Sequence, residues 1–308
     1  MRKHGLRNIA ASNRARLLEL ARQRREDFQF LLGRWMVERF LYRLGISPLR
    51  DRFILKGAML FTVWSGDLYR PTRDIDLLGC GSPAVNDVID AIRQICATEA
   101  EDGLRFDLNA IEGSRIKEDA EYEGVRLKVP ASLDGAKVQL QIDVGFGDAV
   151  EPAADDISFP VILPMEHPTI RAYPPEVVIA EKCQAMVLLG IANSRMKDFY
   201  DVWMMARTMT FQMDRLATAL VRTFERRKTD LPADAPFALT PDFLNDAAKQ
   251  TQWRAFASRS GLTETLPTLT EVGEAIKTFL VPALQAARSP VATKTAWNPP
   301  GPWRAVSE

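Results

Sequence analysis

The sequence predicts an α+β protein in which a small mixed β-sheet, flanked by helices, is followed by a helical C-terminal domain. Alternating apolar residues, which are typical of half-buried strands, are concentrated between residues 74 and 145. Apolar residues in 8–45 and again in 176–287 recur at helical spacing instead. The 308 residues, of which 46% are hydrophobic, are enough to bury a sizeable core in one large domain or two smaller ones.

The first half of the chain is predicted to begin with helices and to continue into the sheet. Residues 8–45 are expected to form two or three helices, and the mostly apolar segment 53–66 is also expected to be helical. The strand "DIDLLG", residues 74–79, follows it. A further helix is predicted to begin at about Pro83 and to run to about Glu101.

Three more strands are predicted from strict alternation in residues 104–111, 124–129 and 137–145. The last two flank an Asp-Gly turn and are therefore expected to form an antiparallel hairpin. Beyond the proline-punctuated stretch 160–175, helices are expected at about 176–190, 195–209, 213–228, 241–258 and 270–287. The proline-rich tail 288–308 has little periodicity and is expected to lack regular structure.

These elements predict four regions with different charge. They are basic N-terminal helices (1–50), a sheet-containing core (51–165), a helical domain (166–287) and the tail (288–308). Residues 1–50 carry 12 Lys and Arg against 4 Asp and Glu, whereas residues 51–160 carry 11 against 21. A basic arm beside an acidic core suits a phosphate-rich partner together with bound cations, although a solvated arginine-rich helix is the simpler alternative.

Composition argues against several other classes of protein. Cys80, Cys96 and Cys183 lack the spacing of a zinc site or a disulfide framework, and two histidines make a hydrolytic triad or a histidine-rich metal site unattractive. No signal peptide or membrane-spanning run is recognisable. We therefore expect a cytoplasmic protein without a membrane partner.

Three aspartates stand where alternation places them on the polar face of their strands. Asp74 and Asp76 alternate with the apolar Ile75 and Leu77, and Asp143 alternates in the same way within "KVQLQIDVG". If the two strands are neighbours, three carboxylates converge on one face and call for a divalent cation to neutralise them. The alternative is that a short D-x-D arises by chance or caps a turn.

Lys182 lies within an apolar stripe of the helix expected at 176–190. Burying a lysine is costly unless it meets an anion. A nucleotide phosphate is one candidate anion, and the pair Asp198 and Asp201, one turn apart on the next helix, is the other. A structural ion pair and a lysine that extends to solvent are the non-functional alternatives.

Two weaker signals precede the D-x-D. Lys56 and Gly57 end an apolar segment, where a glycine can let backbone approach a phosphate closely. Arg73 stands next to Asp74 and is suited either to a phosphate or to a carboxylate.

Taken together, five motifs resemble the AbiEii/AbiGii nucleotidyltransferase toxin family, within the DNA polymerase beta-like nucleotidyltransferase superfamily. They are "FILKGAMLFTVW", "RPTRDIDLLG", "LQIDVGFGD", "EKCQAMV" and "RMKDFYDVW", and the resemblance covers about residues 15–285. It implies a Mg²⁺-dependent nucleotidyltransferase core with an NTP as substrate. The sequence is also similar to mycobacterial toxins of that family, which implies that nucleotides are added to the 3′ acceptor end of tRNA, that translation is blocked and that a cognate antitoxin exists.

The resemblance also implies roles for individual residues. Asp74, Asp76 and Asp143 would bind the metal and act in catalysis, together with Lys182 and Asp198. The nucleotide would be held by Lys56, Gly57, Ala58, Arg73 and Asp201. Ala58 departs from the superfamily pattern, which has a small polar residue there, so a hydroxyl contact to the triphosphate would be missing.

Three other functions remain open at this point. A nucleotidyltransferase acting on a protein or a small molecule would use the same residues, and a non-catalytic interaction protein would keep them only as remnants. A phosphohydrolase of the haloacid dehalogenase type also uses D-x-D after a strand. It expects Thr or Val where Leu78 stands, and parallel βαβ units that this sequence does not predict.

Overall fold

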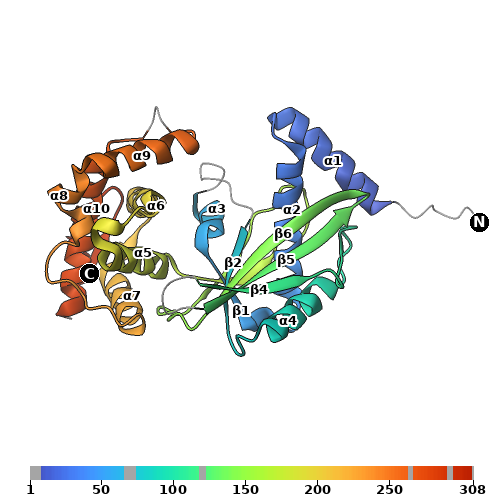
Figure 1. The fold of residues 1–308 in the computed structure, drawn as a ribbon, viewed down its shortest axis with the longest axis horizontal. Coiled ribbons are helices and arrows are strands. Elements are labelled where there is room, and N and C mark those ends of the chain that lie inside the picture. The colour runs from blue at the N-terminus through green and yellow to red at the C-terminus, as the bar shows by residue number, and fades with distance from the viewer. Residues whose placement is uncertain (1–7, 66–73, 118–122, 263–265, 290–293, 307–308) are drawn as a thin grey trace, which may run out of the picture. The chain divides into compact units, whose positions relative to one another are not determined.

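The computed structural model describes residues 8–65, 74–117, 123–262, 266–289 and 294–306 (Figure 1). The chain forms two compact units, Met1–Gly147 with Ala154–Tyr173, and Asp148–Ala153 with Pro174–Glu308. The first contains a mixed sheet with flanking helices, and the second is mainly helical. The predicted α+β class is therefore confirmed.

The sheet of the first unit has eight strands among the described residues. Their bounds are β1 (Phe53–Lys56), β2 (Asp74–Gly79), β3 (Arg105–Phe106), β4 (Glu112–Lys117), β5 (Glu123–Leu133), β6 (Ala136–Phe146), β7 (Asp155–Ser158) and β8 (Thr169–Ala172). Their order is β3-β5-β6-β2-β1-β8-β7, and β4 also pairs with β5. β2 is parallel to β6 and β1 to β8, whereas the other pairs are antiparallel.

The apolar face of this sheet is covered by helices α2 (Phe28–Ile46) and α4 (Val85–Ala97) (Figure 1). Gly113 of β4 is opposite the buried Leu127, and a Cβ at Gly113 would lie 3.0 Å from Ile89 of α4. The ring of Phe40 on α2 lies 6.5 Å from that of Phe106. Because side chains alternate along each strand, the polar residues of these strands point to the opposite face.

Helix α1 (Ile9–Arg24) joins the same unit beside the turn that follows α4. A Cβ at Gly103 would lie 2.6 Å from the backbone of Ala10, so only glycine allows this approach. Beneath the turn, Asp102 is fully buried and accepts hydrogen bonds from Arg39 (3.0 Å) and from both terminal nitrogens of Arg43 (2.6 and 2.9 Å). Two of the basic residues of the N-terminal region therefore have a structural partner.

The expected helix at 53–66 is wrong in its first part. Phe53–Lys56 forms strand β1, a 3-10 turn spans Gly57–Met59, and only Leu60–Ser65 is α-helical (α3). All four residues of β1 are buried, and the strand lies inside the sheet between β2 and β8. A strand buried on both faces is a continuous apolar run, which sequence periodicity does not distinguish from a buried helix.

The strand expected at 104–111 is much shorter than predicted. Only Arg105 and Phe106 pair with β5. The side chain of Asp107 then accepts a hydrogen bond from the backbone N–H of Asn109 at 3.3 Å, and the chain turns. Such an Asx turn ends a strand even where the apolar alternation continues.

The second unit contains six α-helices among its described residues, at nearly the predicted positions. They are α5 (Pro175–Leu189), α6 (Met196–Thr208), α7 (Met213–Arg226), α8 (Pro241–Leu244), α9 (Ala247–Arg259) and α10 (Leu269–Arg288). The helix expected at 241–258 is interrupted because Asp246 caps α9, accepting hydrogen bonds from Ala248 and Lys249 at 2.9 Å. Short 3-10 turns lie at Arg50–Arg52, Gly190–Ala192 and Phe237–Leu239.

No helix within the described ranges is both long enough and apolar enough to cross a membrane.

The expectation of an unstructured tail is wrong for residues 295–305. β10 (Thr295–Trp297) pairs with β11 (Trp303–Ala305) and with β9 (Phe211–Gln212). Trp297 is 2% exposed and donates to the carbonyl of Ala206 at 2.6 Å, and Trp303 stacks on Phe279 of α10. Burial of aromatic rings, rather than periodicity, therefore orders this proline-rich segment.

Candidate active site

A row of charged residues crosses four adjacent strands of the first unit. Lys56 of β1 is opposite Asp76 of β2, Asp76 is the register partner of Asp143 on β6, and Asp143 is opposite Arg126 of β5. Register partners on neighbouring strands point to the same face. The structure thus brings two of the predicted acidic residues side by side, with a cation on each flank of the row.

The same alternation explains why these positions are polar. Ile75, Leu77, Ile142 and Val144 are fully buried on the other face of β2 and β6. The sequence predicts that the carboxylates converge if these two strands are neighbours. The structure shows that β2 and β6 are adjacent. Asp74 begins β2, is exposed, and has Gln141 as its register partner.

Asp143 is held by a two-point ion pair with Arg126. The Nε and Nη2 atoms of Arg126 donate to the two carboxylate oxygens of Asp143 at 2.8 and 2.7 Å. The Asp143 side chain is 11% exposed and that of Arg126 is 41% exposed. The hydrogen bond to Asp143 raises the pKa of Arg126, and the charges of Asp143, Asp74 and Asp76 raise it further. Arg126 therefore lies within the field of all three aspartates.

Arg126 was not among the residues predicted for the site. Its signal was present in "GVRLKV", where the alternation of Val125, Leu127 and Val129 places Arg126 and Lys128 on the polar face. The hairpin of β5 and β6 was predicted, and its register, which pairs Leu133 with Ala136 across the Asp-Gly turn, puts Arg126 opposite Asp143. The missing step was to follow that register from the turn to Asp143.

Gly57 is required by the position of Asp76. It has a φ of +76°, and a Cβ at this position would lie 2.1 Å from the Oδ2 atom of Asp76. Any side chain at position 57 would therefore both strain the backbone and displace the carboxylate. Glycine was expected here for close approach of backbone to a phosphate, and the group that approaches Gly57 in the structure is Asp76.

Ala58 and Lys56, which were also predicted to bind the nucleotide, lie at the β1 end of the row. Ala58 lies in the 3-10 turn that follows β1, and Lys56 is 8% exposed at the end of β1. Arg73, which was predicted to bind the nucleotide, lies outside the described residues.

The donor set of the row suits a divalent cation only in part. Among the described residues, no three acidic, histidine or cysteine side chains form a ready-made metal site. Mg²⁺, however, keeps several waters and is usually bound by one or two carboxylates plus the phosphates of a substrate. Asp76 and Asp143 supply such oxygens at paired positions, and Arg126 already places positive charge on Asp143.

Lys182, Asp198 and Asp201 form a second charged cluster, inside the helical unit. Lys182 of α5 donates to Asp198 at 2.7 Å and to Asp201 at 2.6 Å, both on α6. The three side chains are 15%, 6% and 5% exposed. Of the two anions proposed for Lys182, the aspartates are the partner that the structure provides.

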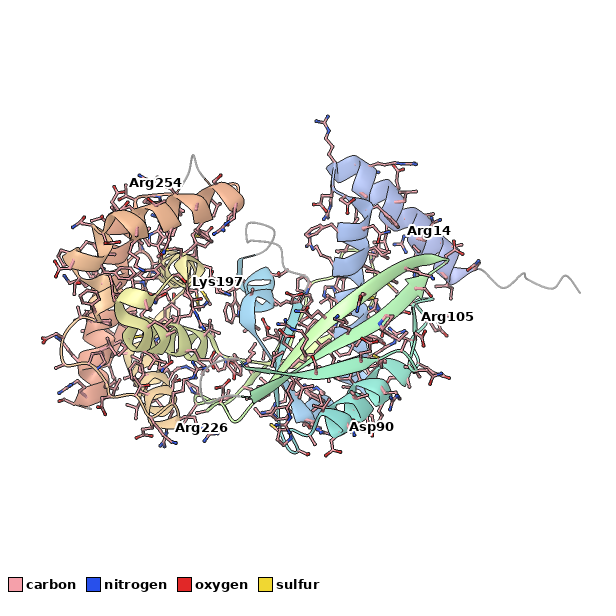
Figure 2. The ribbon with its side chains drawn as sticks, in the orientation of Figure 1. Arg14, Asp90, Arg105, Lys197, Arg226 and Arg254 are labelled. Carbon is pink, nitrogen blue, oxygen red and sulfur yellow. The ribbon has the colours of Figure 1, made fainter. Side chains whose placement is uncertain are left out.

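Burial and charge act in opposite directions on the two aspartates of this cluster. Burial raises the pKa of Asp201 well above its usual value. Burial also opposes ionisation of Asp198, but the charge and hydrogen bond of Lys182, with the charges of Lys197 and Arg195, outweigh it and lower the pKa of Asp198. Lys197 is exposed on α6 (Figure 2). One ammonium thus keeps Asp198 ionised beside a second carboxyl that tends to hold its proton.

Comparison with known proteins gives one family and two distant structural likenesses. The model of the family described as "Nucleotidyl transferase AbiEii toxin, Type IV TA system" matches residues 39–281. Two solved Helicobacter pylori structures, one titled as a candidate nucleotidyltransferase and the other as JHP933, are each 16% identical with a TM-score of 0.48. Each covers 86% of this chain, and the match spans 96% and 94% of the two chains. No curated protein matches the sequence.

Proposed function

The chain belongs to the AbiEii nucleotidyl transferase toxin family of type IV toxin–antitoxin systems, and on this premise we propose that it modifies tRNA. In the proposed reaction, a nucleoside monophosphate is transferred from an NTP to the 3′ acceptor end of tRNA, which blocks translation. The family implies an NTP substrate and a cognate antitoxin. Because tRNA and NTPs are cytoplasmic, we propose that the protein acts there.

The observation that carries the proposal is the pairing of Asp76 with Asp143 on parallel strands, with Gly57 packed against Asp76. Two adjacent carboxylates repel one another, and a fold that holds them together needs positive charge nearby. A non-catalytic protein has no evident need for this arrangement, or for a glycine that accepts a positive φ in order to fit it.

The chemistry expected of these residues is nucleotidyl transfer. The bond between the acceptor oxygen and the α-phosphorus forms, the bond from the α-phosphorus to the pyrophosphate oxygen breaks, and the acceptor hydroxyl loses its proton. Asp143 would take part in removing that proton, and Asp74 and Asp76 would help to hold a divalent cation. Mg²⁺ bound to the three aspartates would supply neutralisation of the triphosphate and of the leaving pyrophosphate.

The remaining predicted residues keep their proposed roles. Lys182 and Asp198 are proposed to act in catalysis and Asp201 in nucleotide binding, as in the family. The nucleotide is also proposed to contact Lys56, the backbone of Gly57 and Ala58, and Arg73. Lys182 would then serve two purposes, since it also pairs with the two buried aspartates next to it.

For the tRNA, the N-terminal helices are the proposed binding surface. Arg16, Arg22, Arg24 and Arg25 are exposed on α1 and at its end, whereas Arg39 and Arg43 of α2 are buried against Asp102. Exposed arginines bind phosphates without regard to base sequence. The exposed group, rather than the whole basic segment, is therefore proposed to contact the acceptor RNA.

The test is incorporation of labelled nucleotide into total tRNA by purified protein, with each of the four NTPs in turn. Asp76→Asn should abolish labelling while the protein keeps its circular dichroism spectrum, because the change removes a charge and leaves the shape. Asp87→Asn on the exposed first turn of α4 is the matched control and should label normally. Full labelling by Asp76→Asn would contradict the proposal, and label found only in protein would redirect it to a protein acceptor.

A further inference from the structure

Arg126 occupies both oxygens of the carboxylate that the proposed reaction needs. Its Nε and Nη2 atoms lie 2.8 and 2.7 Å from the two oxygens of Asp143, so the guanidinium uses the whole carboxylate edge. A cation that binds Asp143 through both oxygens needs the same two lone pairs. Arg126 and a bound cation therefore compete for one acceptor.

The two partners of this ion pair differ in exposure. Asp143 is fixed on β6 between β2 and β5 and is 11% exposed, whereas 41% of the Arg126 side chain is exposed. The guanidinium thus reaches the carboxylate from the solvent side on a long side chain, and it can leave without disturbing the sheet. Water can solvate the departing guanidinium, and a bound cation would take over the compensation of the buried carboxylate, so exchange leaves neither charge without a partner.

A second two-point arginine–carboxylate pair in the same unit is buried on both sides. Arg43 donates to the two oxygens of Asp102 at 2.6 and 2.9 Å, and their side chains are 4% and 0% exposed. Separating that pair would leave the buried guanidinium of Arg43 without its carboxylate, which is strongly destabilising, although Asp102 would keep its ion pair with Arg39. Of these two arginine–carboxylate pairs, the Arg126–Asp143 pair is therefore the one that can separate and re-form.

We propose, resting on the proposed function, that Arg126 is a built-in cation that holds Asp143 in the metal-free protein and is displaced from it when a divalent cation binds. Arg126 is then a positioning residue that keeps Asp143 beside Asp76 and prevents it from being an uncompensated anion. The charges of Asp74 and Asp76 also attract the guanidinium, so it remains close to the carboxylates after displacement. Affinity for the divalent cation is correspondingly weakened by the energy of the Arg126 contact.

The chain offers a matched control for this idea. Lys128 lies two residues along β5 on the same face, is exposed, and is opposite Gln141 rather than an acid. Arg126→Gln and Lys128→Gln remove the same charge from the same strand face. Only the first removes a competitor from Asp143.

The experiment is a calorimetric titration of the full chain with Mn²⁺ in the absence of nucleotide and RNA. Arg126→Gln should bind Mn²⁺ roughly two- to fivefold more tightly than the wild type, which corresponds to the energy of a partly exposed pair. Lys128→Gln should show a smaller gain. Arg126→Lys, which keeps the charge but loses the two-point contact, should fall between wild type and Arg126→Gln and covers the case in which Arg126→Gln folds poorly.

The outcomes separate this inference from the proposed function. If the wild type binds Mn²⁺, Asp143→Asn does not, and Arg126→Gln is no tighter than Lys128→Gln, the inference is overturned while the metal site stands. If Arg126→Gln binds more weakly than wild type, Arg126 supports the cation instead of competing with it, and the inference is again overturned. If wild type and Asp143→Asn bind equally, or neither binds, Arg126 has no cation to compete with in the nucleotide-free protein and the inference is overturned. Labelling of tRNA by the wild type decides the proposed function separately.

Discussion

The Arg126–Asp143 pair and the Lys182–Asp198–Asp201 cluster have similar components but differ in burial. In the first, a 41% exposed guanidinium reaches one carboxylate on a sheet face. In the second, an ammonium that is 15% exposed joins two carboxylates that are almost fully buried between two helices. Because only the first cluster has a member that is largely open to water, Arg126 is suited to exchange partners, whereas the second cluster also stabilises the contact between α5 and α6.

The largest effect is expected from breaking the buried cluster. Lys182→Met leaves two buried carboxylates without their cation and should lower the free energy of unfolding by about 3–5 kcal/mol. Lys277→Met on α10, whose side chain is 39% exposed and whose ammonium lies 3.9 Å from Glu274, should change it by less than about 1 kcal/mol. Urea unfolding of the two variants measures both values, and equal losses would show that the cluster is not a stabilising element.

A smaller effect on the free energy of unfolding is expected from Glu38, which is buried without an ion-pair partner at hydrogen-bond distance among the described residues and should make stability depend on pH. Glu38 of α2 is 4% exposed and accepts a hydrogen bond from the backbone N–H of Ile162 at 2.9 Å. Burial raises its pKa from 4.5 to about 8, against the lowering effect of that hydrogen bond and of nearby arginines. Since the folded state holds the proton more tightly than the unfolded state, stability falls as the pH rises from 4.5 towards 8.

Glu38→Gln should remove that dependence, because the amide is neutral and its oxygen still accepts from Ile162. The variant is expected to match wild type near pH 4.5 and to exceed it by about 3 kcal/mol at pH 7, at ~1.4 kcal/mol for each unit of pKa. Urea unfolding across this range is the measurement. Parallel curves for the two proteins would mean that Glu38 is ionised in the folded state.

The smallest effect is expected at the exposed pair. Arg126→Gln should change the free energy of unfolding by about 1 kcal/mol, because the amide can still donate one hydrogen bond to Asp143 and the lost guanidinium is 41% exposed. The same urea titration measures it. A loss as large as that of Lys182→Met would place Arg126 among the structural arginines and remove the contrast between the two clusters.

Periodicity in the sequence was sufficient to predict the polar face of β2 and β6. Ile75, Leu77, Ile142 and Val144 alternate with the aspartates, so the side on which Asp74, Asp76 and Asp143 lie follows from the strand period alone. Lys182 could be found for a similar reason, as a charge within an apolar helical stripe. Both predictions use local spacing, which a single sequence contains.

What local spacing does not contain is which strands and segments are neighbours. Residues 53–56 form a strand by pairing with β2 and β8, which lie far along the chain from them. The order of residues 295–305 depends on Trp297 and Trp303 reaching Phe279 of α10. Each of these depends on a contact distant in sequence, for which the segment itself carries no pattern.

The route of the chain between the two units limits how the protein can be divided into fragments. Residues 148–153 belong to the helical unit, residues 154–173 return to the sheet unit, and the chain then re-enters the helical unit at Pro174. A fragment that ends at Gly147 would lack β7 and β8, leaving β1 as an open edge able to pair with other chains. A fragment that starts at Pro174 would lose Asp148 and Glu151, which pair with Arg227 and Arg222 of the helical unit. Recombinant work on either half therefore requires a circularly permuted or internally linked chain rather than a simple truncation.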